Sequence, residues 1–256
     1  MSIDYQFAHS IAEIVLNRPE RLNAIDADHF DALNAALGKA VEDDARVLMI
    51  SGAGRSFCAG RDIGEIDPLA EDPADVLRST FNALVMKIAA LPMPSVAAVQ
   101  GACLGAGTGI ALACDVVVAA ADATFASPFG RLGSVPDSGF HWFLTTRLGP
   151  AVAKDIVLTG RELSGSEAAS LGLIARAVPA DELTTRARDV ARSIAAGPTR
   201  AFHLACQIID RASEGASVAE VLAAEAKAQS VAFATDDLRE GLAAFRERRD
   251  PAFVGR

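Results

Sequence analysis

Two loops rich in glycine and alanine are the parts of this 256-residue chain best suited to chemistry. They read SFCAGRD at 56–62 and GACLGAG at 101–107, and each follows an apolar stretch typical of a buried strand. Small residues let a ligand approach the backbone closely, and amides at the start of a helix are free to donate. Two such loops can each direct one N–H group at a single oxygen and stabilise negative charge that develops on a carbonyl. The alternative is that both are tight turns whose glycines serve only steric needs.

A carboxylate that could move a proton lies in the segment SPFGRLGSVPDSG at 127–139. Its two prolines and three glycines predict an irregular loop, and long loops inside compact domains are often functional. Asp137 is therefore a candidate acid/base residue, or else an N-cap for the helix expected after it. His141 lies four residues later and, if the helix starts at Asp137, on the same face. It is a candidate to tune that carboxylate, but a half-buried histidine without a catalytic role is the favoured interpretation.

Other catalytic motifs are missing from the sequence. Gly105-x-Gly107 is followed by Ile110 where a dinucleotide fingerprint needs its third glycine, and the chain has no GxxxxGK[ST], HExxH or GxSxG. The four cysteines form no CxxC pair and have no histidine at ligand spacing, which argues against a disulfide framework and a zinc site. Cys58 and Cys103 neighbour the two loops, but buried structural thiols are the favoured interpretation.

The elements that must position these loops alternate between strand and helix in the first half of the chain, which indicates an α/β domain. Strands are expected at 11–16, 47–51, 96–99, 116–119 and 123–125, and helices after Asp26, over 74–91, over 110–114 and from the capping box at 164–167. Further helices are expected at 181–196, 199–213, 217–232 and 236–248. Gly197-Pro198 divides a core over 1–196 from a helical appendage over 197–256.

Composition limits the possible partners. The chain is 51% hydrophobic, enough for a large core, and its net charge of −9 argues against binding of nucleic acid. No apolar stretch is long enough to span a membrane, and the first residues lack the pattern of a signal peptide. We therefore expect a cytoplasmic protein without a membrane partner.

Five segments together resemble the crotonase, or enoyl-CoA hydratase/isomerase, superfamily along essentially the whole chain. They are LNRPERLNAI (16–25), SFCAGRDI (56–63), AAVQGACLGAGTGIALACD (97–115), FASPFGRLGSVPDSG (125–139) and LSGSEAASLGLIARAV (163–178). The resemblance implies a spiral of ββα units followed by a C-terminal α-helical trimerisation region. It also implies a homotrimer or a dimer of trimers.

The resemblance further implies that an acyl-CoA thioester is the ligand, with no cofactor beyond the coenzyme A of the substrate. By this resemblance, the backbone amides of Ala59 and Ala106 form an oxyanion hole. Residues expected to contact the substrate are Arg18, Arg21, Leu22, Ala24, Asp62, Ile63, Phe129 and Phe140. Asp62 is also expected to cap or brace the first loop, and surface solvation is an equal alternative for the two arginines.

The chain departs from hydratases of the family at both acidic positions. Where those enzymes carry glutamates, this sequence has Gly109 and Phe129, neither of which moves a proton. Addition of water needs one group to activate the water and another to deliver a proton, so an ordinary hydratase is disfavoured. Asp137 instead matches the catalytic acid of a branch that includes 1,2-epoxyphenylacetyl-CoA isomerase and some enoyl-CoA isomerases. That branch leads us to expect an amide side chain near position 109, which this sequence lacks.

These observations favour an acyl-CoA isomerase with Asp137 as the single proton carrier. It would convert 3-enoyl-CoA to 2-enoyl-CoA, or rearrange an acyl-CoA with a ring epoxide, through an enolate held by the two amides. A catalytically silent acyl-CoA-binding protein and a hydratase with atypical acid/base residues are the alternatives.

Overall fold

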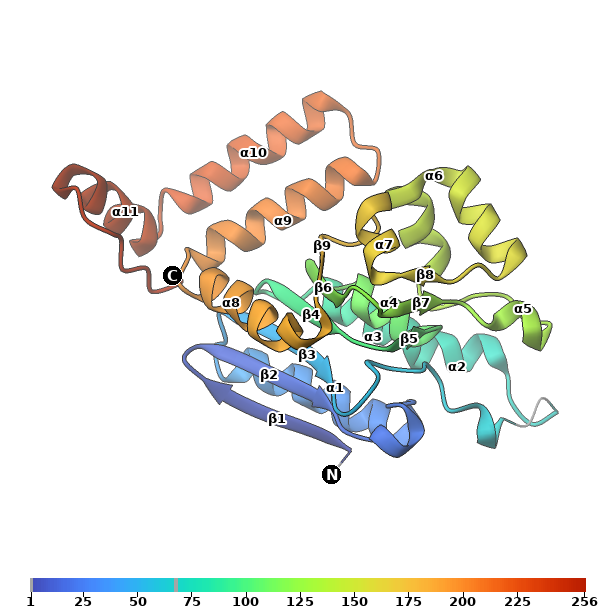
Figure 1. Cartoon of the computed structure of the whole chain (residues 1–256). Helices are drawn as coiled ribbons and strands as arrows, with labels where there is room; N and C mark the ends of the chain where they lie inside the picture. Colours follow the sequence, from blue (N-terminus) through green and yellow to red (C-terminus); the bar gives the residue numbers. More distant parts are fainter. Residues whose placement is uncertain (1, 67–68) are drawn as a thin grey trace.

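A six-stranded sheet forms the centre of the molecule in the computed structural model, which describes residues 2–66 and 69–256 (Figure 1). Its strand order is β1-β2-β3-β4-β6-β9, and only β1 runs antiparallel to its neighbour. The strands are β1 (Ile3–Ala8), β2 (Ile11–Leu16), β3 (Val47–Gly52), β4 (Ser95–Val99), β6 (Val116–Ala120) and β9 (Arg176–Val178). Every residue of β4 is buried, as expected for a parallel strand covered on both faces.

A second, three-stranded sheet lies beside the first. It consists of β5 (Ala102–Leu104), β7 (Thr124–Ala126) and β8 (Leu163–Ser164), in the order β5-β7-β8. Along the chain, β4, β5 and α4 (Ala106–Leu112) follow the same order as β6, β7 and α5 (Phe129–Leu132). One strand joins the large sheet, the next joins the small sheet, and a helix follows. The expected spiral of ββα units is therefore confirmed.

Helices cover the sheets and supply most of the remaining core. The other helices up to residue 195 are α1 (Ala27–Glu42), α2 (Pro73–Ser79), α3 (Phe81–Ala89), α6 (Phe140–Thr159), α7 (Gly165–Leu171) and α8 (Leu183–Ala195). Helix α8 packs across β2, β3, β4 and β6 through a buried row of alanines. The helix expected over 74–91 is instead two helices, because Thr80 leaves the helical region with φ −116° and ψ −92°.

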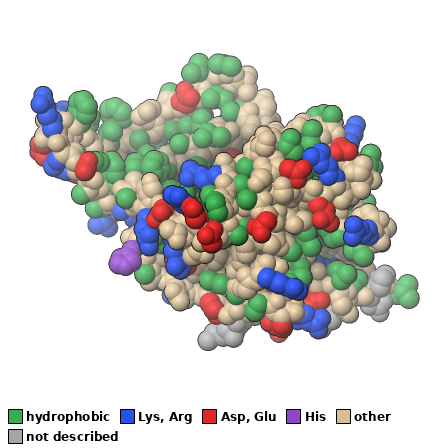
Figure 2. All heavy atoms as spheres, in the orientation of Figure 1, with side chains coloured by type: hydrophobic (Ala, Val, Ile, Leu, Met, Phe, Trp, Pro, Cys, Tyr) green, Lys and Arg blue, Asp and Glu red, His purple; other side chains and the backbone are tan. Residues whose placement is uncertain are grey.

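Three helices extend from the core after Gly197: α9 (Thr199–Ser213), α10 (Val218–Ala232) and α11 (Asp236–Glu247). Figure 1 shows α9 and α10 side by side, reaching away from the sheets, with α11 beyond them. Their bounds agree with the sequence prediction to within a residue. Large apolar side chains are exposed on them, and Figure 2 shows hydrophobic side chains gathered over this arm with few charges among them. No helix within the described ranges is long and apolar enough to cross a membrane.

Candidate active site

The two loops predicted to carry chemistry lie against each other. Cys58 and Cys103 pair as a short parallel bridge: the Cys58 amide donates to the Ala102 carbonyl at 3.1 Å, and the Leu104 amide donates to the Cys58 carbonyl at 2.9 Å. Gly60 has φ +92°, and a Cβ there would lie 2.8 Å from the Leu104 carbonyl oxygen and 3.2 Å from the Ala106 nitrogen. A glycine is therefore needed at position 60 for the first loop to approach the start of α4.

The Ala106 amide is available as a donor, as predicted. Ala106 is the first residue of α4, where backbone N–H groups lack an acceptor within the helix. Its amide has no hydrogen-bond acceptor among the residues that the structure describes. Because Gly105 precedes it with φ +51° and donates to the Ala126 carbonyl at 3.1 Å, the turn is fixed on its other side.

The Ala59 amide is not available, which corrects the sequence-based assignment. It donates to the Leu22 carbonyl at 2.9 Å and so holds the first loop onto the N-terminal turn. The free donor is two residues further on. Ile25 donates to the Gly60 carbonyl at 2.8 Å and accepts from the Asp62 amide at 2.8 Å, so the Arg61 amide between them faces away from Ile25.

Within residues 2–66 and 69–256, the Arg61 amide has no acceptor. The pair of amides suited to bind one oxygen is therefore that of Arg61 and Ala106. A signal for this lay in the alternation of an extended segment, in which amides point in opposite directions at successive residues. The partner strand residue, Ile25, is distant in sequence, so the direction could not be assigned from the loop alone.

Asp137 lies half-buried just before α6. Its Oδ1 accepts a hydrogen bond from the Ser138 hydroxyl at 2.8 Å. Gly139 is the residue that precedes the first turn of α6, and that helix has no side-chain cap, so the alternative in which Asp137 is an N-cap is wrong. The carboxylate is left for another role.

Burial raises the pKa of Asp137 above its usual value, and the Ser138 hydroxyl and the charges of Arg61 and His141 offset part of that rise. Because the charge of Arg61 lowers this pKa, the carboxylate must lie near the side chain of Arg61 in the first loop. Gly109 in α4 touches Ser138, which associates it with the second loop as well. A carboxyl group with a raised pKa beside two donor loops is suited to take up and return a proton.

Gly109 is required by the position of the loop that carries Asp137. A Cβ at 109 would lie 2.2 Å from the Ser138 carbonyl oxygen and 2.8 Å from the Ser138 Cβ. Contacts that short do not occur without a shift of the backbone, so neither a glutamate nor an amide side chain can occupy this position. The loop that contains Ser138 occupies the space that a side chain at position 109 would need.

Phe129 places an aromatic ring where related hydratases carry their second acid. It is the first residue of α5, and a Cβ on Gly105 would lie 3.2 Å from its ring atom Cε2. The ring therefore covers the turn that presents the Ala106 amide and gives that side of the site an apolar wall. Phe140, in contrast, is only 3% exposed and belongs to the hydrophobic core, so its expected contact with substrate is not supported.

The turn at residues 18–24 mainly holds the first loop in place. Most of its side chains that were expected to contact substrate offer little exposed surface for a ligand. Arg18 is directed inward, with Nη1 3.0 Å from Asp62 Oδ2 and 2.9 Å from Asp26 Oδ2, so its charge is already compensated. Leu22 supplies the carbonyl that holds Ala59, and Ala24 is 8% exposed. Asp62 accepts from the Gly64 amide at 3.1 Å, which confirms that it caps this segment.

Arg21 and Ile63 are the members of the expected contact set that remain on the surface. The buried cysteines beside the loops are excluded as nucleophiles. Burial raises the pKa of Cys58 to about 12 and that of Cys103 well above its usual value, so neither forms a thiolate near neutral pH. Nucleophilic catalysis by these two thiols is therefore not supported.

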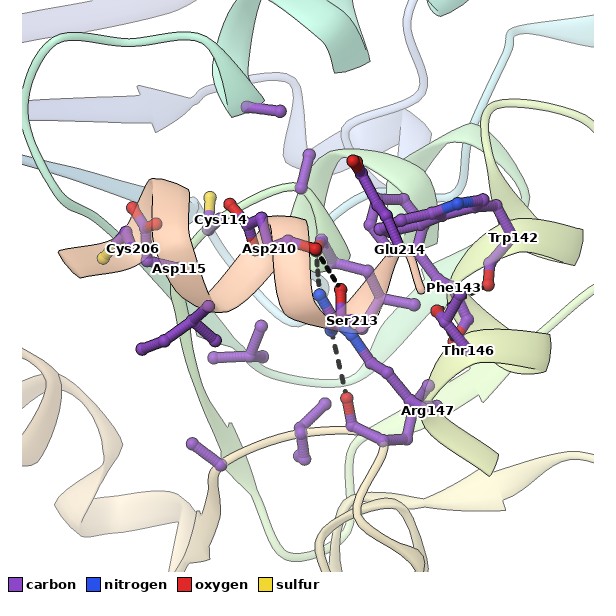
Figure 3. A pocket seen from close by; sticks show the side chains of 18 of the residues that line it. Cys114, Asp115, Trp142, Phe143, Thr146, Arg147, Cys206, Asp210, Ser213 and Glu214 are labelled. Carbon is purple, nitrogen blue, oxygen red and sulfur yellow. Dashed lines mark hydrogen bonds between the residues drawn. The ribbon is translucent and has the colours of Figure 1, made fainter. Parts of the chain in front are cut away.

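A cavity of about 600 Å³ lies elsewhere, between α9 and the core (Figure 3). Arg147 forms part of its wall and donates to the Leu112 carbonyl at 2.8 Å and to the Leu173 carbonyl at 3.1 Å. Asp115, Asp210 and Glu214 also line it, but none of the residues expected to contact substrate does. Arg147 donates a hydrogen bond to the C-terminal end of α4. We therefore attribute this cavity to the packing of α9 against the core.

Comparison with known proteins agrees with the fold. The sequence profile described as "Enoyl-CoA hydratase/isomerase" matches residues 6–256. A probable enoyl-CoA hydratase of Rhodobacter capsulatus is 38% identical over 100% of this chain and 98% of its own length. The 1,2-epoxyphenylacetyl-CoA isomerase of Escherichia coli is 37% identical over 96% of this chain and 95% of its own. The crystal structure of a protein described as an enoyl-CoA hydratase/isomerase of Mycobacterium abscessus superposes with a TM-score of 0.92 at 35% identity, over 99% of this chain and all of that one.

Proposed function

Since the chain belongs to the enoyl-CoA hydratase/isomerase family and is an enzyme of it, we propose that its reaction is the isomerisation of an acyl-CoA with Asp137 as the only proton carrier. The observation that carries the proposal is the steric exclusion of any side chain at Gly109 by Ser138. Together with Phe129 at the second acidic position, it leaves Asp137 as the carboxylate among the three positions at which the resemblance leads us to expect an acid. A proton shuttle needs one such group, whereas hydration needs two.

The reaction begins when Asp137, as the carboxylate, removes a proton from C2 of a 3-enoyl-CoA. The electron pair of the broken C–H bond forms the C1–C2 double bond of an enolate, and the negative charge develops on the thioester oxygen. The amides of Arg61 and Ala106 donate to that oxygen and stabilise the charge. Protonation at C4 by Asp137 then shifts the double bond to C2–C3 and restores the thioester, so no external donor is consumed.

A ring epoxide attached to the acyl group is the second substrate class that suits these parts. The Escherichia coli relative, 37% identical, is described as a 1,2-epoxyphenylacetyl-CoA isomerase. That reaction also needs two amides that stabilise an enolate. It needs one acid that protonates or deprotonates a neighbouring atom as well. Phe129 gives the site an apolar wall that suits either an aliphatic or an aromatic acyl group.

The experiment that tests the proposal is a panel of CoA thioesters with products resolved by mass. We expect the wild-type enzyme to isomerise at least one 3-enoyl-CoA or ring-epoxide acyl-CoA without change of mass. Asp137→Asn keeps the shape of the side chain and should lose at least about 100-fold in kcat while binding the thioester normally. Asp122→Asn, which removes an exposed carboxylate in the turn between β6 and β7, is the matched control.

Two results would contradict the proposal. Addition of one water to crotonyl-CoA at a rate comparable with isomerisation would assign the chain to the hydratases instead. Saturable binding of every thioester without any turnover would assign it to acyl-CoA-binding proteins without catalytic function.

We also propose that the chain assembles as a homotrimer or a dimer of trimers through α9, α10 and α11. The exposed apolar side chains on these helices support this, because an isolated chain rarely leaves so many in water. Among them are Phe202, Ile209, Leu222, Phe233 and Phe245.

A further inference from the structure

A chain of charged contacts lies behind the first donor loop. The guanidinium of Arg18 brings one nitrogen, Nη1, within 3.0 Å of Asp62 Oδ2 and 2.9 Å of Asp26 Oδ2. All three side chains are largely buried, at 20%, 17% and 26% exposed respectively. Since both carboxylate oxygens lie near the same nitrogen, they are at most about 6 Å apart and would repel each other without Arg18.

Asp26 is fixed from its other side. Its Oδ1 accepts from the His29 backbone amide at 3.0 Å as the N-cap of α1, and the same oxygen lies 2.5 Å from His29 Nδ1. His29 is buried in α1, which packs against β1 and β2. The contacts therefore run from a helix of the core, through Asp26 and Arg18, to Asp62 in the donor loop.

Asp62 is the neighbour of the residue whose amide matters. Its backbone N–H donates to the Ile25 carbonyl at 2.8 Å, and its side chain accepts from Gly64 at 3.1 Å. These bonds fix the peptide that follows Arg61. The peptide that precedes Arg61 is fixed by the bond between Ile25 and the Gly60 carbonyl. The Arg61 N–H belongs to the second of these peptides, and the anchoring of Asp62 holds the peptide next to it.

We propose that Arg18 is a positioning residue for the oxyanion hole: by holding the carboxylates of Asp26 and Asp62 together, it anchors the loop that presents the Arg61 amide. This inference rests on the proposed function and adds to it. Arg18 acts through Asp62 and needs no contact with the acyl-CoA. Its role therefore differs from the substrate contact that the sequence predicted for it.

The expected effect follows from the geometry of electrostatic catalysis. An amide stabilises a developing oxyanion only from hydrogen-bond distance, and loss of one such donor typically costs about 100- to 1,000-fold in kcat. A displaced donor should cost less than a deleted one, so Arg18→Gln should lower kcat about 10- to 100-fold. KM should change less than about threefold, because the loop is displaced and no substrate contact is removed.

Three variants separate positioning from stability. Arg18→Gln leaves two neighbouring carboxylates without their cation and should lower Tm as well as kcat. The double variant Arg18→Gln/Asp62→Asn removes that repulsion, so it should recover Tm but stay slow. Arg18→Lys keeps the charge without the planar guanidinium and should lie between wild type and Arg18→Gln; it takes the place of Arg18→Gln if that variant does not fold. Arg186→Gln, a substitution on α8 that breaks an exposed pair with Glu182, is the matched control for loss of one arginine.

A readout that needs no turnover separates this inference from the proposed reaction. 4-(Dimethylamino)cinnamoyl-CoA absorbs at longer wavelength when its thioester carbonyl is polarised, so the red shift on binding reports the oxyanion hole even if no isomerase substrate is found. We expect wild type, Arg186→Gln and Asp137→Asn to show the full shift, and Arg18→Gln and the double variant to lose at least about half of it. A full shift in folded Arg18→Gln or Arg18→Lys, with kcat within twofold of wild type, would overturn the positioning role and leave the function of Asp137 untouched.

Discussion

Gly109 lies where hydratases of the family carry a glutamate, and because it has no side chain, the backbone at Ser138 can approach it closely. The missing Cβ makes room for the Ser138 carbonyl, and the residue before Ser138 is the proposed proton carrier. The two features are therefore linked: the loop can bring Asp137 to the site only because position 109 has no side chain.

This link predicts that restoring the family's glutamate will not restore hydration. Gly109→Glu should displace Ser138, lower kcat for isomerisation at least about 10-fold and destabilise the protein by about 1–3 kcal/mol through overpacking. Both reactions and the urea-unfolding midpoint are the measurements. Gly38→Ala, where a Cβ meets no atom within 4 Å in α1, is the matched control and should be slightly stabilising. Hydratase activity in Gly109→Glu would show that the loop is not fixed as described.

The raised pKa of Asp137 gives the enzyme a defined pH dependence. Because the base form starts the reaction, kcat/KM should fall as pH drops through the pKa of this carboxyl, at a higher pH than an ordinary aspartate would give. Arg61→Gln retains the backbone amide but removes a charge that lowers this pKa, so the acid limb should move to still higher pH. The measurement is the pH profile of both enzymes; an unchanged acid limb in Arg61→Gln would contradict the electrostatic assignment.

The raised pKa of Asp137 also makes the free energy of unfolding depend on pH. A carboxyl whose pKa is raised in the folded state binds its proton more tightly there than in the unfolded chain, so the free energy of unfolding decreases as pH rises through that interval. At pH 7 the ionised Asp137 is therefore a cost, and Asp137→Asn should raise Tm at pH 7 but not well below the ordinary pKa of aspartate. Calorimetry at the two pH values tests this, and a lower Tm at pH 7 would contradict it.

Some residues of the candidate site could be predicted from the sequence, and others could not. The two loops, Ala106 and Asp137 were identifiable as candidates from local composition and from the resemblance. The choice between the Ala59 and Arg61 amides was not, because it depends on bonds to Leu22 and Ile25 in a different segment.

At the scale of elements, α4 is held at its C-terminal end. Its first residue presents the Ala106 amide, and the carbonyl of its last residue, Leu112, accepts from the guanidinium of Arg147. Arg147 also lies 5.0 Å from the centre of the Phe143 ring and bonds the Leu173 carbonyl. A cation at a helix C-terminus interacts favourably with the helix dipole.

Removal of that cation should therefore loosen α4. Arg147→Gln is expected to lower the free energy of unfolding by about 2–3 kcal/mol, the range for hydrogen bonds from a charged group to buried acceptors. Urea unfolding measures the change, and Arg192→Gln, an exposed pair on α8, should change it by less than about 0.5 kcal/mol. Equal effects of the two substitutions would show that Arg147 does not hold the helix.

Length alone did not decide which elements could be predicted. The six-residue strand β1 was missed because only one of its side chains is buried, whereas the three-residue β7 was expected at 123–125. The C-terminal helices were foreseen closely because each has several turns of helical periodicity and clear capping residues, such as the Ser217–Glu220 box. Strands β8 and β9, of two and three residues, are too short for an alternation to be recognised. The break at Thr80 carries neither glycine nor proline and had no local signal.

At the scale of the whole molecule, the arm formed by α9, α10 and α11 lacks a partner in a single chain. We expect light scattering to give three or six times the chain mass. Phe245→Asp, at a side chain that is 83% exposed, should shift the protein towards smaller species if this face is the interface. Val41→Asp, on the exposed side of α1, is the control. A monomeric wild-type protein, or no change in Phe245→Asp, would contradict the assignment of this arm to assembly.

The central claim is that one carboxylate, Asp137, carries the proton from C2 to C4. Its most direct test is the conversion of a 3-enoyl-CoA deuterated at C2, followed by mass spectrometry that locates the label in the product. We predict that wild type forms the 2-enoyl-CoA with deuterium at C4 above the background of solvent exchange, and that Asp137→Asn forms at least about 100-fold less product. Turnover of Asp137→Asn at the wild-type rate, or a product heavier by one water, would contradict the account.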